Sequence, residues 1–404
     1  MADRRYKWKR FWCPPTGRIN LSDGDYLLDP DSDWGPDLNP DVVPFGSLAD
    51  TPSLVLIGEP GMGKSVEMKG QCELLGQHVQ ASTDRVLRFD LRDYQTDLML
   101  HQKVFAHPDL EDWAAGDHTV HLFLDSLDEG LLSVETLATL LPTELAAYRS
   151  HLHRLYFRIA CRTAQWPRVL ESSLRDLWGE DAVGVYELAP LRHIDVAEAA
   201  EVNGLVAEEF LYEVARRDAG PFASKPVTLD FLLRVYRKEG TFPQTRRELY
   251  ERGCRLLCEE VNPSRVASRR IGQLTADQRL LIAGRLAAVT VFANRAAIWT
   301  EPDRGDVPDS DVTLERLSGW VEETRDRRVR VEVTRDAIRE TLDTGLFSSR
   351  GGSRMGWAHQ SYGEFLAAWY LSGHRMSPVQ TRSLIVHPGD PKGKLVPSDK
   401  STIV

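Results

Sequence analysis

A glycine-rich turn early in the chain ends in a lysine and a serine, two residue types that bind phosphate and magnesium. The stretch "SLVLIGEPGMGKSVEMKG" fits the pattern G-x-x-x-x-G-K-[ST], with an apolar run before the turn and a helical run after it. Glycines let successive backbone N–H groups turn inward toward phosphates, and the start of a helix adds its positive dipole end. We therefore predict a nucleotide-binding phosphate loop formed by Gly58, Glu59, Pro60, Gly61, Met62, Gly63, Lys64, Ser65 and Val66.

Acidic residues further along the chain complete the chemistry predicted for the loop. Lys64 would bring its charge to the β- and γ-phosphates, and Ser65 would bind Mg²⁺. The apolar run "HLFLD" ends at Asp125, and a carboxylate at the carboxyl edge of a neighbouring strand can hold Mg²⁺ beside Ser65. Asp128 and Glu129 follow within one helical turn, so either could polarise an attacking water. These residues predict a nucleoside-triphosphate site in which Ser65 and Asp125 bind the metal.

The segments around these residues must form the elements that position them. Between residues 51 and 190, short apolar runs alternate with helical stretches, which is typical of buried parallel strands in an α/β domain. From about residue 193 onward, apolar residues recur at helical spacing, with one strand-like stretch, "RRVRVEVT". Near the N-terminus Tyr6, Trp8 and Trp12 alternate with basic residues, which predicts a short strand with one packed face.

Three stretches, "GEPGMGKS", "LFLDSLDE" and "RIACRTAQWP", together resemble the NACHT branch of the STAND class of signal-transducing P-loop ATPases. The second stretch fits the D-[GAS]-h-D-E motif of that branch. The resemblance implies a catalytic set of Asp125, Asp128, Glu129 and Arg162, in which Arg162 at a strand end monitors the γ-phosphate. The position of Arg162 also fits a charge that caps the end of the sheet.

Two later stretches extend the resemblance to residues from about 52 to 371. Pro226 in "SKPVTLDFLL" matches the proline that touches the base and sugar of the nucleotide, although a proline there also fits the first residue of a helix. His359 in "WAHQSYGEFLAAWYL" matches the histidine that contacts the diphosphate of bound ADP, and a packing role fits it as well. Both residues are therefore predicted to contact the nucleotide.

The resemblance also implies a domain order, in which an α/β P-loop NTPase domain is followed by a helical domain and a winged-helix domain. The predicted segments are an N-terminal extension (1–50), the NACHT-like NTPase domain (51–192), the helical domain (193–262), the winged-helix domain (263–371) and a C-terminal tail or truncated start of a sensor region (372–404).

By the same resemblance the protein acts as a switch. ADP would hold a resting form, and exchange for ATP would favour protomers that self-associate, with slow hydrolysis as the reset. ATP rather than GTP is implied, the unknown trigger is expected to be a protein, and antiviral (anti-phage) defence follows by analogy. Two alternatives stay open: a constitutive AAA-type ATPase motor and a winged-helix DNA-binding regulator.

The composition argues against several other classes of protein. The net charge is -10, and no run approaches the roughly 18 apolar residues of a membrane span. The longest candidate, "LLIAGRLAAVTVFA", is interrupted by Arg285, and the N-terminus lacks the apolar core of a secretory signal. The basic stretch "RDRRVRVEVTRDAIR" contains interleaved acids, which argues against DNA as a partner. We therefore predict a cytoplasmic protein with no membrane partner.

Overall fold

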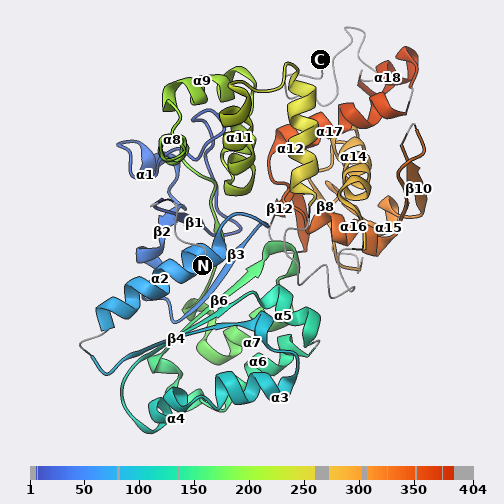
Figure 1. Cartoon of the computed structure of the whole chain (residues 1–404). Helices are drawn as coiled ribbons and strands as arrows, with labels where there is room; N and C mark the ends of the chain where they lie inside the picture. Colours follow the sequence, from blue (N-terminus) through green and yellow to red (C-terminus); the bar gives the residue numbers. More distant parts are fainter. Residues whose placement is uncertain are drawn as a thin grey trace. The chain divides into compact units, whose positions relative to one another are not determined.

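The computed structural model describes residues 6, 8–79, 82–134, 136–259, 273–302, 307–324, 326–350, 353–374 and 376–385. The described residues form two compact units, which meet in the sequence between Thr241 and Phe242 (Figure 1). The first unit contains the phosphate loop and Pro226, and the second contains His359.

The first unit is built on a seven-stranded sheet in the order β2-β1-β7-β3-β6-β5-β4. The five parallel strands are β3 (Ser53–Gly58), β4 (Arg85–Asp90), β5 (Val120–Asp125), β6 (Leu155–Arg162) and β7 (Val183–Leu188). Because they run in the same direction, their carboxyl ends meet at one edge of the sheet. Gly58 is in register with Arg162 there, and Asp90 with Asp125.

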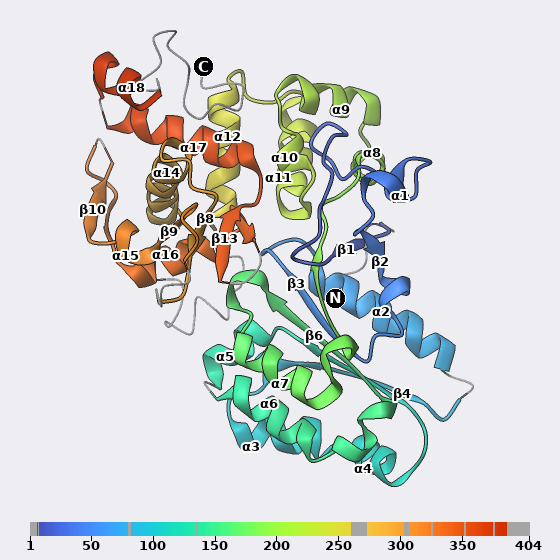
Figure 2. The ribbon, with the colours of Figure 1, turned by 180° about the vertical axis from the view of Figure 1, so that it is seen from behind.

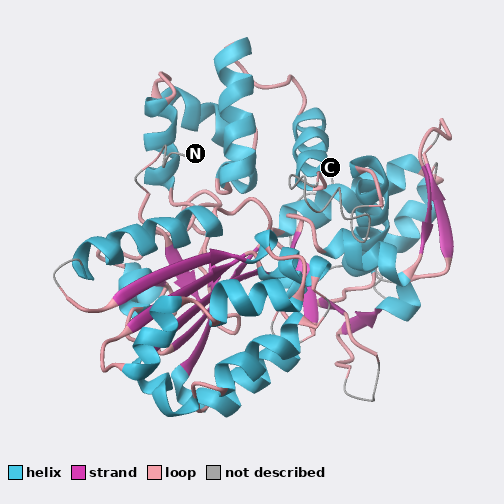
Figure 3. Ribbon diagram, turned by 60° about the horizontal axis from the view of Figure 1, so that its bottom comes forward, coloured by secondary structure: helices cyan, strands magenta, loops and turns pink. Residues whose placement is uncertain are grey.

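Helices cover both faces of this sheet (Figure 3). On one face Leu54 of β3 packs with Met68 of α2 (Lys64–His78) and with Trp12. Val55 points to the other face and packs with residues of the opposite helices. Those helices are α4 (Pro108–Ala115), α5 (Leu127–Ser133), α6 (Leu137–Ala146) and α7 (Arg168–Trp178). β3, the middle strand of the seven, is buried on both faces, which explains its continuous apolar sequence.

The N-terminal strand differs from the prediction. β1 (Phe11–Cys13) is shorter than the alternating stretch, and all three of its residues are buried rather than one face only. β1 pairs antiparallel with β2 (Val43–Pro44) on one side and with β7 on the other, so it lies inside the sheet. A strand with neighbours on both sides and packing on both faces cannot keep a solvated face.

Four described helices follow the last strand of the sheet in the first unit. They are α8 (His193–Val202), α9 (Ala207–Arg216), α10 (Gly220–Ala223) and α11 (Pro226–Glu239). α11 begins with Pro226 at its first helical position, where the missing N–H costs no hydrogen bond. It ends at Gly240, which has a φ of 69° and caps the helix in the left-handed conformation.

The second unit combines helices with a small sheet. Its helices are α12 (Arg246–Leu257), α14 (Ala276–Phe292), α15 (Leu314–Leu317), α16 (Arg335–Leu342), α17 (Gln360–Gly373) and α18 (Pro378–Ile385). Its strands are β8 (Ala297–Trp299), β9 (Asp311–Thr313), β12 (Phe347–Ser349) and β13 (Arg354–Trp357) in the order β12-β13-β8-β9, with a separate hairpin of β10 (Trp320–Glu323) and β11 (Arg330–Val333). Figures 1 and 2 show α12, α14 and α17 side by side. Gly284 permits this approach, because a Cβ there would lie 3.2 Å from the ring of Trp369.

The structure confirms the predicted fold class, an α/β P-loop NTPase domain followed by helical and winged-helix regions. The strand-like stretch "RRVRVEVT" contains β11. The change of unit after Thr241 falls inside the segment predicted as the helical domain. The bounds of the five predicted segments stay predictions. Among the described residues no helix has both the length and the apolar character needed to cross a membrane.

Candidate functional site

The phosphate loop joins the end of β3 to the start of α2 at the carboxyl edge of the sheet. Gly61 has a φ of 76° and Gly63, the N-cap of α2, has a φ of 94°. Only glycine adopts this left-handed region without a steric cost, so the backbone favours glycine at both positions, of which Gly63 belongs to the motif. The loop is thus shaped as the motif predicted, with the helix N-terminus at its end.

Lys64 and Ser65 lie where the sequence predicted, at the first turn of α2. The Lys64 ammonium donates hydrogen bonds to the carbonyl oxygens of Gly58 and Glu59, at 2.5 and 3.1 Å. Burial lowers the pKa of this ammonium, an effect that the nearby Asp128 carboxylate opposes. The Ser65 hydroxyl donates to Asp125 Oδ1 at 3.2 Å. The structure therefore brings the predicted phosphate and magnesium residues together.

The donor set at this edge fits magnesium. Ser65 and Asp125 supply only oxygen atoms, the type that Mg²⁺ prefers, and Mg²⁺ sites commonly use one or two carboxylates plus substrate phosphates. In the described part of the chain no group of three or more His, Cys, Asp or Glu side chains could hold a metal by itself. Water and the oxygen atoms of a bound nucleotide would complete the coordination of a metal held by these two residues.

Asp90 is a functional candidate that the sequence analysis missed. It ends β4 as Asp125 ends β5, and the two are in register across the strands. Burial, together with the charge of Asp90, raises the pKa of Asp125. The signal was present in the sequence, because "RVLRFD" is also an apolar run that ends in aspartate.

Arg92 is a second missed residue, and it connects Asp90 with a predicted catalytic group. Its Nε lies 2.8 Å from Asp90 Oδ1 and 3.3 Å from Glu129 Oε2. The hydrogen bonds from Arg92 outweigh burial and lower the pKa of Asp90. One cation thus pairs with two carboxylates beside Asp125.

Ser126, directly after Asp125, has a left-handed backbone with φ 63° and ψ 42°. This conformation is costly for a residue with a Cβ, and such strained positions cluster at functional sites. The turn starts α5 and places Asp128 and Glu129 in its first turn. A tight turn at a small residue is therefore what places the two acids next to the end of β5.

Arg162 lies at the end of β6, as predicted, and pairs with Asp128. Its Nε is 3.0 Å from Asp128 Oδ2, and its backbone N–H donates to Asp128 Oδ1 at 3.2 Å. Both side chains are less than a tenth exposed. Asp128 is thus held by Arg162 from two directions, through its side chain and through its backbone.

Pro226 stands between two residues that contact the phosphate loop. Lys225 forms a buried ion pair with Glu59 of the loop. A Cβ at Gly61 would lie 2.7 Å from Val227 Cγ1, so the first turn of α11 packs directly on the loop. The sequence analysis selected Pro226 but not its neighbours, whose contacts join positions far apart in the chain.

Arg10 also supports the loop and was not predicted. Its guanidinium donates to the carbonyl oxygens of Met62, at 2.9 Å, and Ala189, at 2.7 Å. It is 7% exposed, and burial lowers its pKa to about 10 although the Glu67 carboxylate opposes the shift. The N-terminal extension therefore contributes a buried cation to the phosphate loop.

His359 belongs to the second unit, where it is the N-cap of α17. Its Nδ1 accepts a hydrogen bond from the Ser361 backbone N–H at 3.2 Å, and its ring packs near Tyr362. The capping role is the local packing role that the sequence left open. The predicted contact with the diphosphate of ADP stays a prediction.

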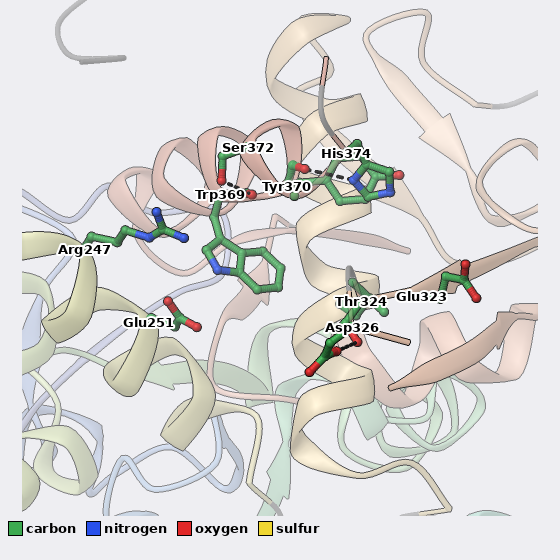
Figure 4. A pocket seen from close by; sticks show the side chains of 11 residues that line it. Arg247, Glu251, Glu323, Thr324, Asp326, Trp369, Tyr370, Ser372 and His374 are labelled. Atoms are coloured by element: carbon green, nitrogen blue, oxygen red, sulfur yellow. Dashed lines mark hydrogen bonds between the residues drawn. The ribbon is translucent and has the colours of Figure 1, made fainter. Parts of the chain in front are cut away.

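The second unit also contains a pocket of about 430 Å³, shown in Figure 4. It lies between α12, α14, α17 and the turn after β10, with Arg247, Glu251, Asp326 and Trp369 in its lining. None of the predicted site residues is among the described residues that line it. The pocket is therefore lined by residues other than those of the predicted site.

No family model matches the sequence, and no curated protein matches it. Among solved structures, the chain is similar to the ORC2 protein of Aeropyrum pernix, with 13% identity and a TM-score of 0.35 over 82% of this chain and 91% of that one. It is also similar to a Walker-type ATPase of Pyrococcus abyssi, with 13% identity and a TM-score of 0.37 over 80% and 93% of the two chains. A third similar structure is the Aeropyrum pernix ORC1 protein in complex with DNA, with 14% identity and a TM-score of 0.37 over 67% and 80%. At these scores the similarities are too distant to assign a family or a function.

Proposed function

We propose that the chain binds ATP with Mg²⁺ at the phosphate loop and hydrolyses it slowly, as a nucleotide-gated switch. The observation that supports this most directly is the Ser65–Asp125 hydrogen bond, because it joins both predicted magnesium ligands beside the loop. A metal there would neutralise charge on the β- and γ-phosphates during phosphoryl transfer. Lys64 would exchange its bonds to loop carbonyls for bonds to phosphate oxygens.

The surrounding contacts favour Glu129 over Asp128 as the group that orients and deprotonates the attacking water. Arg162 binds both oxygens of Asp128, so Asp128 serves better to hold that arginine in place. Arg162 would then direct positive charge at the γ-phosphate. Glu129 instead pairs with Arg92 at 3.3 Å, and the Arg92 side chain is 41% exposed, so water weakens this pair more than the buried pair of Asp128.

The switch function follows the resemblance to the NACHT branch. In this proposal Pro226 and His359 contact ADP in the resting form, and exchange for ATP favours self-association in response to a protein trigger, in antiviral defence. Lys225 and Val227 support the place of Pro226, since both contact the phosphate loop. ADP and ATP must contact the two states differently, because a ligand shifts an equilibrium only by its differential affinity.

The first test is to identify the nucleotide that co-purifies with the protein after denaturation. We expect near-stoichiometric ADP in the wild type and none in Lys64→Ala. Lys69→Ala is the matched control, because Lys69 lies on the same helix but is exposed and pairs with Glu73. Steady-state turnover should stay below about one per minute, against roughly 10 s⁻¹ for a typical enzyme.

Two results would contradict the proposal in different ways. An empty wild-type site with brisk ATP turnover would replace the switch by a constitutive AAA-type motor. No binding of ADP or ATP by the wild type would reject the nucleotide site itself.

A further inference from the structure

The phosphate loop carries an acid where it must bind an anion. Glu59, the second residue of the loop, has a side chain only 10% exposed. A buried carboxylate is costly unless it is paired, and an unpaired one beside the loop would repel phosphate. The ammonium of Lys225, itself 5% exposed, supplies the opposite charge.

A second contact joins the same two segments independently of charge. Val227 packs on Gly61 so closely that a Cβ at Gly61 would lie 2.7 and 2.8 Å from its side-chain atoms. Lys225 is the N-cap of α11 and Val227 is the second residue of the helix, on either side of Pro226. They contact the loop at Glu59 and Gly61. The start of α11 therefore holds the loop at two points.

The Glu59 backbone is also linked to the phosphate-binding lysine. The Lys64 ammonium donates to the Glu59 carbonyl oxygen at 3.1 Å. Lys225 thus holds the side chain of the residue whose backbone orients Lys64. A shift of α11 would change the position of Glu59 and, through it, the position of the Lys64 ammonium.

Resting on the nucleotide site proposed above, we infer that Lys225 is a positioning residue for the phosphate loop. It cancels the charge of Glu59 and ties the loop to α11, so that nucleotide affinity depends on the position of α11. The same linkage works in reverse, because nucleotide binding must then favour the arrangement in which Lys225 and Glu59 are paired. The ion pair between Lys225 and Glu59 thus couples the position of α11 to the affinity of the loop for nucleotide.

The test measures binding of ADP by calorimetry at a temperature where every variant is folded. Lys225→Met keeps the length of the side chain and removes its charge, leaving Glu59 buried and uncompensated. We expect ADP affinity to fall about tenfold or more, because breaking one partner of a buried pair leaves the other charge stranded. The double variant with Glu59→Gln should recover most of that loss and stay about threefold weaker than wild type, since the tether is still missing.

The control is Arg279→Met, which breaks an equally buried ion pair, with Glu340, in the second unit. It should lower the melting temperature but leave ADP affinity within about twofold of wild type. If the wild type binds ADP and Lys225→Met binds it within about twofold as tightly, the inference is wrong while the proposed function stands. A wild type that binds neither ADP nor ATP would remove both.

Discussion

At the residue scale, hydrolysis is expected to depend on Glu129, whose Oε2 lies 3.3 Å from the Arg92 guanidinium. Glu129→Gln keeps the size of the side chain but removes the base, so kcat should fall about 100-fold or more while ATP affinity stays nearly unchanged. Asp128→Asn should instead weaken ATP binding, because it releases the buried Arg162. Single-turnover hydrolysis and equilibrium binding of ATP, measured for both variants, separate the two effects. If Glu129→Gln hydrolysed ATP as fast as the wild type, Glu129 would not be the base that deprotonates the attacking water.

A pH dependence also belongs to this scale. Burial and the neighbouring Asp90 raise the pKa of Asp125, so its carboxylate takes up a proton at a higher pH than an ordinary aspartate does. Only the ionised form can hold Mg²⁺ with Ser65. The gain in ATP affinity on adding Mg²⁺ should therefore shrink as the pH falls from neutral, and Asp90→Asn should move that loss to lower pH. Titrations of ATP binding with Mg²⁺ and with EDTA check this, and an unchanged midpoint in Asp90→Asn would contradict it.

At the scale of elements, the N-terminal extension is part of the seven-stranded sheet that carries the phosphate loop. Its strand β1 pairs with β2 and β7, and Arg10, directly before β1, donates to the loop carbonyl of Met62. A segment that merely preceded the sheet in the chain would neither pair with its strands nor donate a hydrogen bond to the loop. The first residues of the sheet therefore help to hold the phosphate loop.

Arg10→Met should lower both stability and nucleotide affinity. It removes hydrogen bonds to Met62 and Ala189, and bonds from charged donors contribute about 1.5–3 kcal/mol each. We expect a lower melting temperature and ADP binding that is weaker by about tenfold. Lys9→Met is the matched control, since Lys9 is exposed and pairs with Asp31 at the surface. Equal ADP affinities for the two variants would show that the extension does not support the loop.

At the scale of the whole molecule, the proposed switch predicts that the nucleotide sets the state of assembly. Protein loaded with ADP should have the mass of a single chain, and Glu129→Gln loaded with ATP should form a larger species, because slow hydrolysis keeps ATP bound. Size-exclusion chromatography with light scattering measures both masses. Lys64→Ala should not respond to either nucleotide. Identical masses with ADP and ATP, measured with the protein trigger absent and present, would contradict the switch.

The sequence by itself determined the parts of the site that depend on local spacing. The loop glycines, Lys64 and Ser65 follow from one short motif between a strand and a helix, and Asp125 follows from an apolar run that ends in an acid. These predictions needed no long-range contact, since the left-handed glycine backbone and the order of strand, turn and helix are local features of the chain. The fold class followed for the same reason, from apolar runs that alternate with helical stretches.

Only the tertiary structure decided which distant residues complete the site. Arg10 and Arg92 are ordinary charged residues in the sequence, and Lys225 has no distinguishing feature within "SKPVTLDFLL". Asp90 ends an apolar run, but that pattern does not show which carboxylate it lies beside. Their roles arise from strand order and register, which place Asp90 opposite Asp125, and from packing, which buries Arg10 and Lys225 beside the loop. Charged side chains become specific only when burial removes water and forces each to find a partner, and burial is a property of the folded chain.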